Sequence, residues 1–181
     1  MRKSESWCRD VDVMLSEEKI KERVGQLGAQ ITQAYQGEEI ILVGILRGSF
    51  IFYSDLVRQI NLPVHCEFMG ISSYGDATKS SGVVQITSDL TLSIADKHVL
   101  IIEDIIDTGL TMSYLLKNLS TRHPKSLKNC TLLHKPGGMK VDVPIDYAGF
   151  RIENEFVIGY GLDYTGLYRN LPFIGVYRGA R

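Results

Sequence analysis

Three carboxylic acids and two threonines lie close together near the middle of the chain. Glu103 and Asp104 come directly after an unbroken apolar run, and Asp107 follows three residues later. Thr108 and Thr111 add hydroxyl groups to the same short stretch. Carboxylates at such a position can accept hydrogen bonds from sugar hydroxyls or bind a hard cation such as Mg²⁺, and one of them can act as a general base. A phosphorylated sugar with a metal ion would use all of these groups.

The residues around the acids predict a strand, a tight turn and a helix. Val99–Ile102 has no polar alternation, which is typical of a strand that is covered on both faces. Gly109 supplies the bend, and apolar residues then recur at helical spacing, so we expect a helix to begin near Thr111. The free N–H groups and the dipole of a helix start suit a phosphate. Acids that merely cap the helix and face water would explain one carboxylate better than three.

Two cations follow other expected strands. Ile40–Leu46 is a second unbroken apolar run, and it ends in Arg47 and Gly48, which could bring a charge and a close backbone to a pyrophosphate. Lys135 follows the apolar run 129–134 and could donate to an exocyclic oxygen, as on a 6-oxopurine ring. Open α/β sheets bind ligands at the carboxyl ends of their strands. Without that context, an exposed loop position would explain Arg47 equally well, and solvated surface would explain Lys135 better.

An aromatic residue and a long polar segment are further candidates. Phe156 offers a face on which a purine can stack, although a place in the core is the commoner role of such a residue. The segment 72–82 is polar and small, and it lies between the expected strands 64–71 and 83–87. It is either a plain hairpin loop or a lid that keeps water from a reactive intermediate.

The alternation of buried strands with helices predicts a three-layer α/β domain with a mostly parallel central sheet. We expect a helix that begins after Ser16, and a last strand over 173–177. The N-terminal segment and roughly residues 136–172 are expected to form a small hood over the strand ends. At 181 residues the chain should be a single domain, 1–181.

Composition excludes several classes of protein. The formal net charge of -1 gives no electrostatic reason to expect binding to nucleic acid or to a membrane. No apolar run approaches the ~20 residues that span a bilayer, and the N-terminus lacks the apolar core of a signal peptide. Cys8, Cys66 and Cys130 are widely separated and form no metal-binding pattern, which indicates reduced thiols in a cytoplasmic protein.

The motif Glu-Asp-Ile-Ile-Asp-Thr-Gly within residues 99–111 resembles the phosphoribosyl-pyrophosphate signature of type I phosphoribosyltransferases, in the form found in their hypoxanthine-guanine branch. The chain has neither a Walker A loop nor a Gly-x-Gly-x-x-Gly fingerprint. The resemblance covers roughly Leu15 to Tyr177. It implies a purine-salvage enzyme that transfers 5-phosphoribose from its diphosphate donor to hypoxanthine or guanine, with Mg²⁺ as cofactor and with a homodimer or homotetramer as the assembly.

The resemblance also implies a role for each candidate residue. Asp107 would be the catalytic base, and Ser73 and Tyr74 would belong to the lid. The ribose 5-phosphate would be bound by Glu103, Asp104, Asp107, Thr108, Gly109, Leu110 and Thr111. Pyrophosphate would be bound by Arg47, Gly48 and Arg169, and the purine base by Lys135, Phe156, Val157 and Asp163. Metal ions would be bound by Glu103, Asp104 and Asp163.

Two positions depart from the pattern of the family. Arg47 stands where the family usually has Lys, which keeps the charge but alters the donor geometry. Leu110 also replaces a frequent Lys, so the phosphate turn would rely more on backbone donors. The motif does not decide the purine preference, because a lysine that recognises the 6-oxo group serves hypoxanthine, guanine and xanthine alike.

Three alternative functions remain open from the sequence. The first is a xanthine-guanine enzyme of the same family. The second is a transcriptional regulator of the same fold, although such proteins usually need a basic face or an added DNA-binding domain. The third is an interaction module without chemistry, which leaves the clustering of polar groups at strand ends unexplained.

Overall fold

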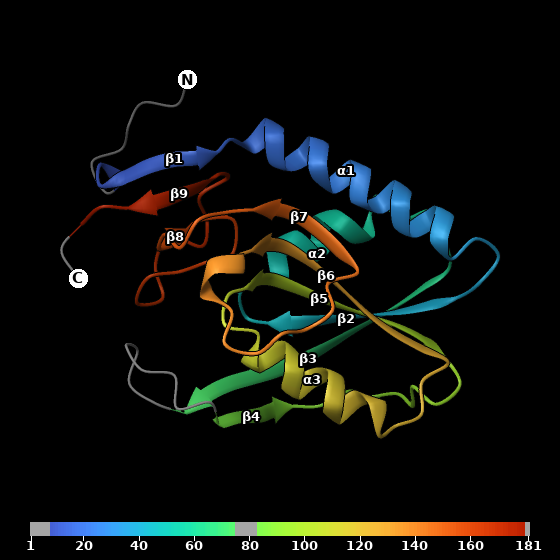
Figure 1. Ribbon diagram of the computed structural model, residues 1–181. Helices are drawn as coiled ribbons and strands as arrows, with labels where there is room; N and C mark the ends of the chain where they lie inside the picture. The colour runs from blue at the N-terminus through green and yellow to red at the C-terminus, as the bar shows by residue number, and fades with distance from the viewer. Residues whose placement is uncertain (1–7, 75–82, 180–181) are drawn as a thin grey trace.

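The computed structural model describes residues 8–74 and 83–179 of the chain. A six-stranded sheet forms its middle layer, in the order β4-β3-β2-β5-β6-β7. Helices α1 (Glu17–Ala34) and α2 (Phe50–Val57) cover one face, and α3 (Leu110–Ser120) covers the other (Figure 1). The strands are β2 (Ile40–Leu46), β3 (Val64–Tyr74), β4 (Val83–Ser88), β5 (His98–Ile106), β6 (Ser126–His134) and β7 (Tyr147–Arg151). The three-layer α/β expectation is confirmed.

The central sheet is mostly parallel, as its apolar strands predicted. β2 pairs in parallel with β3 and β5, and β6 pairs in parallel with β5 and β7, whereas β3 and β4 are antiparallel. Successive residues of β5 point to opposite faces, so Leu100 and Ile102 pack in the core under α1 and α2, while Val99 and Ile101 pack under α3. Both faces of the sheet are therefore lined by apolar residues. Because β2, β5 and β6 are parallel, their carboxyl ends lie next to one another at the same edge of the sheet.

Helix α1 is stabilised by its N-cap and by two long-range hydrogen bonds from Arg23. Ser16 is its N-cap, and the Ser16 hydroxyl accepts a hydrogen bond from the amide of Lys19 at 3.4 Å. Arg23 donates from Nε to the carbonyl of Gly149 at 2.9 Å and from Nη2 to that of Ala148 at 2.6 Å. These bonds tie the helix to the edge strand β7. None of the described helices is long and apolar enough to cross a membrane.

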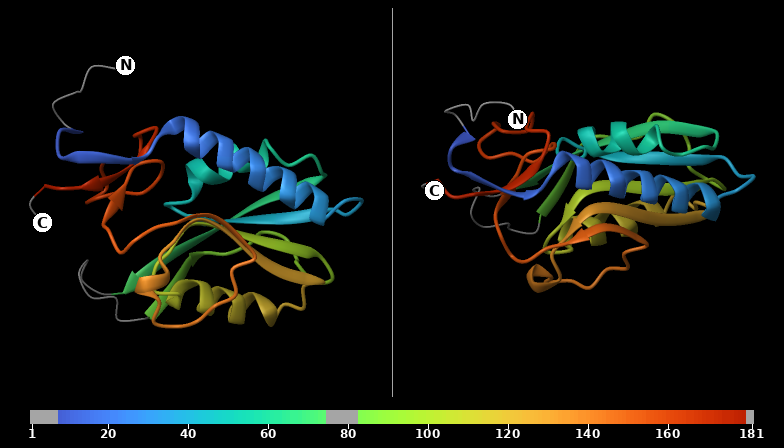
Figure 2. Two further views of the ribbon diagram at one scale, coloured as in Figure 1. Left: turned by 45° about the horizontal axis from the view of Figure 1, so that its top comes forward. Right: turned by 90° about the horizontal axis from the view of Figure 1, so that it is seen from above.

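A second, three-stranded sheet in the order β1-β9-β8 lies at one end of the molecule (Figure 2). It consists of β1 (Val11–Leu15), β8 (Val157–Ile158) and β9 (Ile174–Tyr177). We call this small sheet, together with the segment between β8 and β9, the hood; the range 136–172 expected for it stays a prediction. β7 falls within the range 136–172 and yet pairs with β6 in the central sheet, while β9 lies beyond that range and is the middle strand of the small sheet. In both cases the sheet to which the strand belongs is decided by pairing with strands elsewhere in the sequence.

Two strands are longer than their sequence pattern predicted. β5 continues to Ile106, so Glu103 and Asp104 lie within the strand instead of in the turn after it. β3 continues to Tyr74, and Ser73 and Tyr74 pair with β4 through their backbones. Residues 75–82, the remainder of the expected lid after Tyr74, lie outside the described part of the chain. Backbone pairing with a neighbouring strand carries both strands beyond their apolar runs.

Candidate active site

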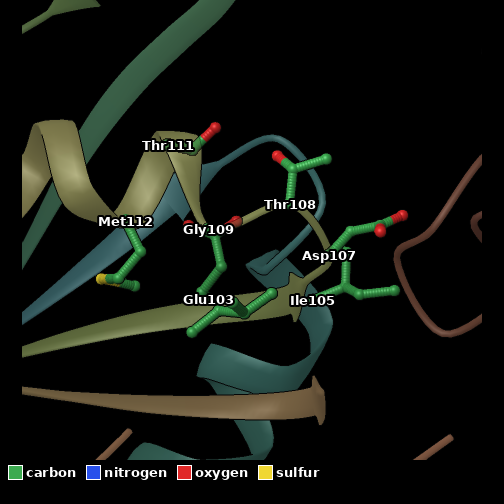
Figure 3. A pocket seen from close by; sticks show the side chains of 8 residues that line it. Glu103, Ile105, Asp107, Thr108, Gly109, Thr111 and Met112 are labelled. Atoms are coloured by element: carbon green, nitrogen blue, oxygen red, sulfur yellow. The ribbon is translucent and has the colours of Figure 1, made fainter. Parts of the chain in front are cut away.

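A cavity of about 250 Å³ lies where β5 turns into α3. Figure 3 shows the Thr108 and Thr111 hydroxyls on the same side of the turn and the Asp107 carboxylate pointing away from the helix. The lining residues come from the end of β5 and the first turn of α3: Glu103, Ile105, Ile106, Asp107, Thr108, Gly109, Thr111 and Met112. The hydroxyls and the start of α3 make this cavity suitable for a phosphate.

Gly109 allows this turn to form. It is the N-cap of α3 and has a φ of 78°, which strongly favours glycine. A Cβ atom at this position would collide with the carbonyl oxygen of Val141. The Thr108 carbonyl in turn accepts hydrogen bonds from the amides of Lys140 and Val141 at 2.9 and 3.2 Å. The turn is thus held against the segment that follows β6.

Glu103 and Asp104 are adjacent acids near the end of β5, of which Asp104 is buried and Glu103 half-buried. Burial and the neighbouring Asp104 charge raise the pKa of Glu103 well above its usual range, and burial also raises the pKa of Asp104. The Oε2 atom of Glu103 is buried without a hydrogen-bond partner among the described residues. A Cβ atom on Gly48 would collide with Asp104 Oδ2, so the loop after β2 directly contacts this carboxylate. An unpartnered, buried carboxylate is an unfavourable arrangement that a bound cation or a sugar hydroxyl would relieve.

A second cavity, of about 270 Å³, lies beside the first and reaches the hood. Its lining combines residues of the central sheet with residues of the hood: Gly48, Asp104, Ile105, Asp107, Lys135, Phe156, Val157, Leu162, Asp163 and Arg169. The structure therefore brings eight of the predicted site residues to one space. Ile105 and Leu162 were missed, because an apolar residue next to a polar motif gives no signal of its own in the sequence.

Lys135 and Asp107 form an ion pair at the boundary of the two cavities. The Lys135 ammonium donates to Asp107 Oδ2 at 3.0 Å. Lys135 is only 6% exposed, so its charge has an anionic partner inside the protein, whereas the Asp107 side chain is 43% exposed and faces the cavities. A buried ammonium group without such a partner would be strongly destabilising. The pair places a cation and a possible proton acceptor next to the same ligand space.

Phe156 lies on the hood side of the second cavity. Its ring packs edge-to-face against Tyr164, with 5.8 Å between the centroids, and it also packs against Tyr177 at 6.5 Å. Its carbonyl accepts a hydrogen bond from the Tyr177 amide at 3.1 Å. The next residue, Val157, is buried. Phe156 is therefore neither a plain core residue nor a free surface ring, because it is half-buried and supported by aromatic neighbours.

Asp163 and Arg169 are bound to each other at the same cavity. Arg169 Nη2 pairs with Asp163 Oδ1 at 2.7 Å, and Asp163 Oδ2 accepts from the amide of Gly166 at 2.7 Å. Both carboxylate oxygens of Asp163 thus have partners. Within residues 8–74 and 83–179, no group of three or more metal-binding side chains is assembled. The expected metal ligands Glu103, Asp104 and Asp163 therefore form no single cluster here, and their role as ligands stays a prediction.

Two other predicted residues stand apart from the cavities. Arg47 is exposed at the end of β2 and lines neither cavity, although its neighbour Gly48 does. The peptide bond between Leu46 and Arg47 is cis. Leu110 is the first residue of α3 and is not part of the cavity lining, whereas the residues on both sides of it are. The side chains of Ser73 and Tyr74 belong to the part of the chain that is not described.

Comparison with known proteins shows the family to which the chain belongs. Residues 10–165 match the phosphoribosyl transferase domain, and the chain belongs to this family. It is 55% identical over 168 residues to hypoxanthine-guanine phosphoribosyltransferase of Dictyostelium discoideum, which covers 91% of this chain and 93% of the relative. It is 52% identical over 168 residues to hypoxanthine phosphoribosyltransferase of Haemophilus influenzae, with 91% and 94% covered.

A solved structure agrees with these relatives. The crystal structure of a hypoxanthine phosphoribosyltransferase from Staphylococcus aureus superposes with a TM-score of 0.92 and 46% identity, and covers 97% of this chain and 96% of that one. The type I phosphoribosyltransferase fold is thereby confirmed, and the chain is a transferase.

Proposed function

We propose that this protein is a purine-salvage enzyme that transfers 5-phosphoribose from 5-phosphoribosyl 1-diphosphate to hypoxanthine and guanine, which yields IMP or GMP and pyrophosphate. The observation that carries the proposal is the second cavity, in which Asp107, Lys135 and Phe156 surround one space of about 270 Å³. These groups match the acidic N–H, the 6-oxo group and the flat face of a 6-oxopurine. The name of the Dictyostelium discoideum relative supports both bases, and that of the Haemophilus influenzae relative supports hypoxanthine.

The chemistry is a substitution at the anomeric carbon of the ribose. N9 of the purine forms a bond to C1 while the bond from C1 to the pyrophosphate oxygen breaks, and Asp107 accepts the N7 proton. Lys135, released from Asp107, donates to the 6-oxo group, and Phe156 stacks on the ring. The transition state resembles an oxocarbenium ion, so catalysis depends on positioning and charge stabilisation. The ion pair between Lys135 and Asp107 keeps both groups in place before the base binds.

The other substrate would lie across the two cavities. The turn from Asp107 to Thr111 holds the 5'-phosphate, mainly through backbone amides and the two threonine hydroxyls, because Leu110 offers no charge. Glu103 and Asp104 accept hydrogen bonds from the ribose hydroxyls. Gly48, Arg47 and Arg169 bind the pyrophosphate, with Arg47 turning toward it from its exposed position.

Mg²⁺ fits the two adjacent acids of β5, of which Glu103 lines the first cavity and Asp104 the second. Both carboxylates are hard oxygen ligands, and the unpartnered Oε2 of Glu103 would accept a cation. When bound, Mg²⁺ would neutralise part of the charge on the diphosphate and its leaving group. Asp163 would serve a second ion only after it gives up its bond to Arg169.

Three further features belong to this proposal. Ser73 and Tyr74 would begin a lid that keeps water from the donor. A cytoplasmic location follows from the cysteine pattern and the nature of the substrates. A homodimer or homotetramer is supported by two exposed rings, Phe50 at 43% and Phe68 at 40%, on the neighbouring elements α2 and β3.

The replacement Asp107→Asn tests the general base. Asn keeps the size of the side chain but cannot accept a proton, so we expect the forward rate with hypoxanthine to fall by about 10²-fold or more, while IMP still binds. Steady-state rates and calorimetric titration with IMP measure the two effects. Near-normal turnover by the variant would contradict the assignment.

A panel of hypoxanthine, guanine and xanthine, with the diphosphate donor and Mg²⁺, tests the substrate class on the wild-type enzyme. We expect turnover of the first two. A preference for xanthine with guanine would indicate the related xanthine-guanine activity instead, and absence of turnover with all three would overturn the proposed function.

A further inference from the structure

The turn that connects β8 to Asp163 packs against the loop that begins α2. Gly159, Tyr160 and Gly161 all have positive φ, at 95°, 50° and 101°, so the chain reverses sharply there. A Cβ atom on Gly161 would collide with the carbonyl oxygen of Gly48. The hood and the central domain are therefore in direct backbone contact beside the second cavity.

One part-buried hydrogen bond between side chains closes this contact. The Tyr160 hydroxyl donates to Asp55 Oδ2 at 2.6 Å, although the two residues are 105 positions apart. Tyr160 is 6% exposed, and burial together with Asp55 raises its pKa, so the hydroxyl stays protonated and able to donate. Asp55 lies in the second turn of α2, and its other carboxylate oxygen pairs with Arg58. The bond joins the hood turn to the helix that follows the Gly48 loop.

Both sides of this contact carry groups of the site. On the hood side, Arg169 Nη1 donates to the carbonyl of Gly161 at 2.6 Å, and Arg169 Nη2 pairs with Asp163 at 2.7 Å. On the other side, Gly48 touches the Asp104 carboxylate. Neither Tyr160 nor Asp55 lines either of the two cavities of the site. The hydrogen bond between them therefore acts on the site only through the residues on either side of it.

We propose that the hydrogen bond between Tyr160 and Asp55 is a positioning contact for the pyrophosphate half of the site. It holds Arg169, which comes from the hood, at a fixed distance from Gly48, which comes from the central domain. The inference rests on the proposed function, since it takes the group between these two residues to be the diphosphate of the donor. Two separate loops can bind one diphosphate specifically only if they are held at a fixed distance and orientation relative to each other.

The purine side of the hood is held by other bonds. β8 pairs with β9 through Val157 and Ile158, and the Phe156 carbonyl accepts from the Tyr177 amide. Loss of the Tyr160 hydroxyl should leave these bonds intact. The contact is therefore expected to affect the binding of the diphosphate donor much more than the binding of the purine.

The test is Tyr160→Phe, which removes one hydroxyl and leaves the ring. We expect KM for 5-phosphoribosyl 1-diphosphate to rise by about fivefold to tenfold, which is part of what the loss of one charge-assisted hydrogen bond can cost, with KM for hypoxanthine within about twofold of wild type. Asp55→Ala should act in the same way. Asp55→Asn keeps an acceptor oxygen and should restore nearly normal values. The double variant Tyr160→Phe/Asp55→Ala should be no worse than either single variant.

Tyr53→Phe is the matched control. Tyr53 is buried on the same helix, but its hydroxyl donates to the carbonyl of Leu42 in β2, at 3.1 Å and away from the hood. It should lower stability by a similar amount and leave KM for the donor unchanged. An unchanged donor KM in Tyr160→Phe, an equal rise in both KM values, or an equal rise in Tyr53→Phe would overturn the proposal. Inactivity of the wild-type enzyme toward every purine would instead refute the proposed function, so the two failures are distinguishable.

Discussion

Asp107 is held by contacts on two sides, and each contact uses one oxygen of its carboxylate. Lys135 pairs with Oδ2, and Gly138 lies against Oδ1 so closely that a Cβ atom there would collide with it. Gly138 belongs to the short 3-10 helix Pro136–Gly138, directly after the lysine. The residue proposed as general base is thus oriented by its ion pair with Lys135. Its carboxylate also occupies space that is open only because Gly138 has no side chain. A glycine that touches a reacting group is a positioning residue even though it has no chemistry of its own.

Gly138→Ala should therefore lower kcat with little change in fold. The new methyl group would push the Asp107 carboxylate from its place, and a displacement of about 1 Å can cost 10²-fold in rate, so we expect a loss of about tenfold or more. The neighbouring Gly137→Ala is the control, since a Cβ atom there meets nothing within 4 Å. Steady-state kinetics and urea unfolding of both variants make the comparison. Equal rates in the two alanine variants would contradict the expectation.

At the scale of elements, the last strand of the described chain supports the expected base platform. Tyr177 of β9 packs against Tyr164 with 4.7 Å between the ring centroids, and both rings contact Phe156. Tyr168 adds a further ring beside Tyr177 at 5.8 Å. The purine face of the site therefore depends on residues from three separate segments of the hood. The turn around Tyr160 depends on α2 instead, so the two halves of the hood have different anchors.

Tyr177→Leu should weaken binding of the purine selectively. Loss of the ring removes aromatic contacts behind Phe156, which contribute about 0.5–1.5 kcal/mol beyond the burial of area, so we expect KM for hypoxanthine to rise by about twofold to tenfold. Tyr177→Phe keeps the ring and serves as the control. Kinetics with each substrate varied in turn measure the effect. If KM for the diphosphate donor rose as much as KM for hypoxanthine, a general disturbance of the hood would be the better explanation.

At the scale of the whole molecule, a buried histidine links stability to pH. His134 ends β6 and is 9% exposed, and burial together with the charge of Arg151 lowers its pKa below the usual value. The unfolded chain therefore binds more protons than the folded protein in the range between the lowered pKa and about 6.5. Stability is fully present above pH 6.5 and falls as the pH drops through this range.

His134→Gln should remove this part of the pH dependence. Gln is neutral at every pH, so the difference in free energy of unfolding between pH 7.5 and pH 5.5 should be smaller in the variant than in the wild type. Urea unfolding at the two pH values provides the measurement. His65→Gln, at an exposed histidine, is the control. An unchanged pH dependence in His134→Gln would show that other groups are responsible.

The sequence by itself determined the local elements and most candidate residues of the site. Unbroken apolar runs predicted β2, β5 and β6, because a strand covered on both faces has no polar side. The acids, hydroxyls and glycine between Glu103 and Thr111 predicted the phosphate turn, because a strand followed by a tight bend and a helix is encoded within about a dozen neighbouring residues. The family motif supplied the remaining candidates, and the structure gathers most of them around two adjoining cavities.

Only the tertiary structure decided which distant groups touch. The ion pair of Lys135 with Asp107, the hydrogen bond of Tyr160 with Asp55 and the contact of Gly48 with Asp104 each join segments whose separation in sequence carries no distance information. The same holds for the pairing of β7 in the central sheet and of β9 in the small sheet, which the sequence did not predict. A short strand pairs with whichever edge the rest of the fold presents, and that choice depends on long-range packing rather than on its own residues.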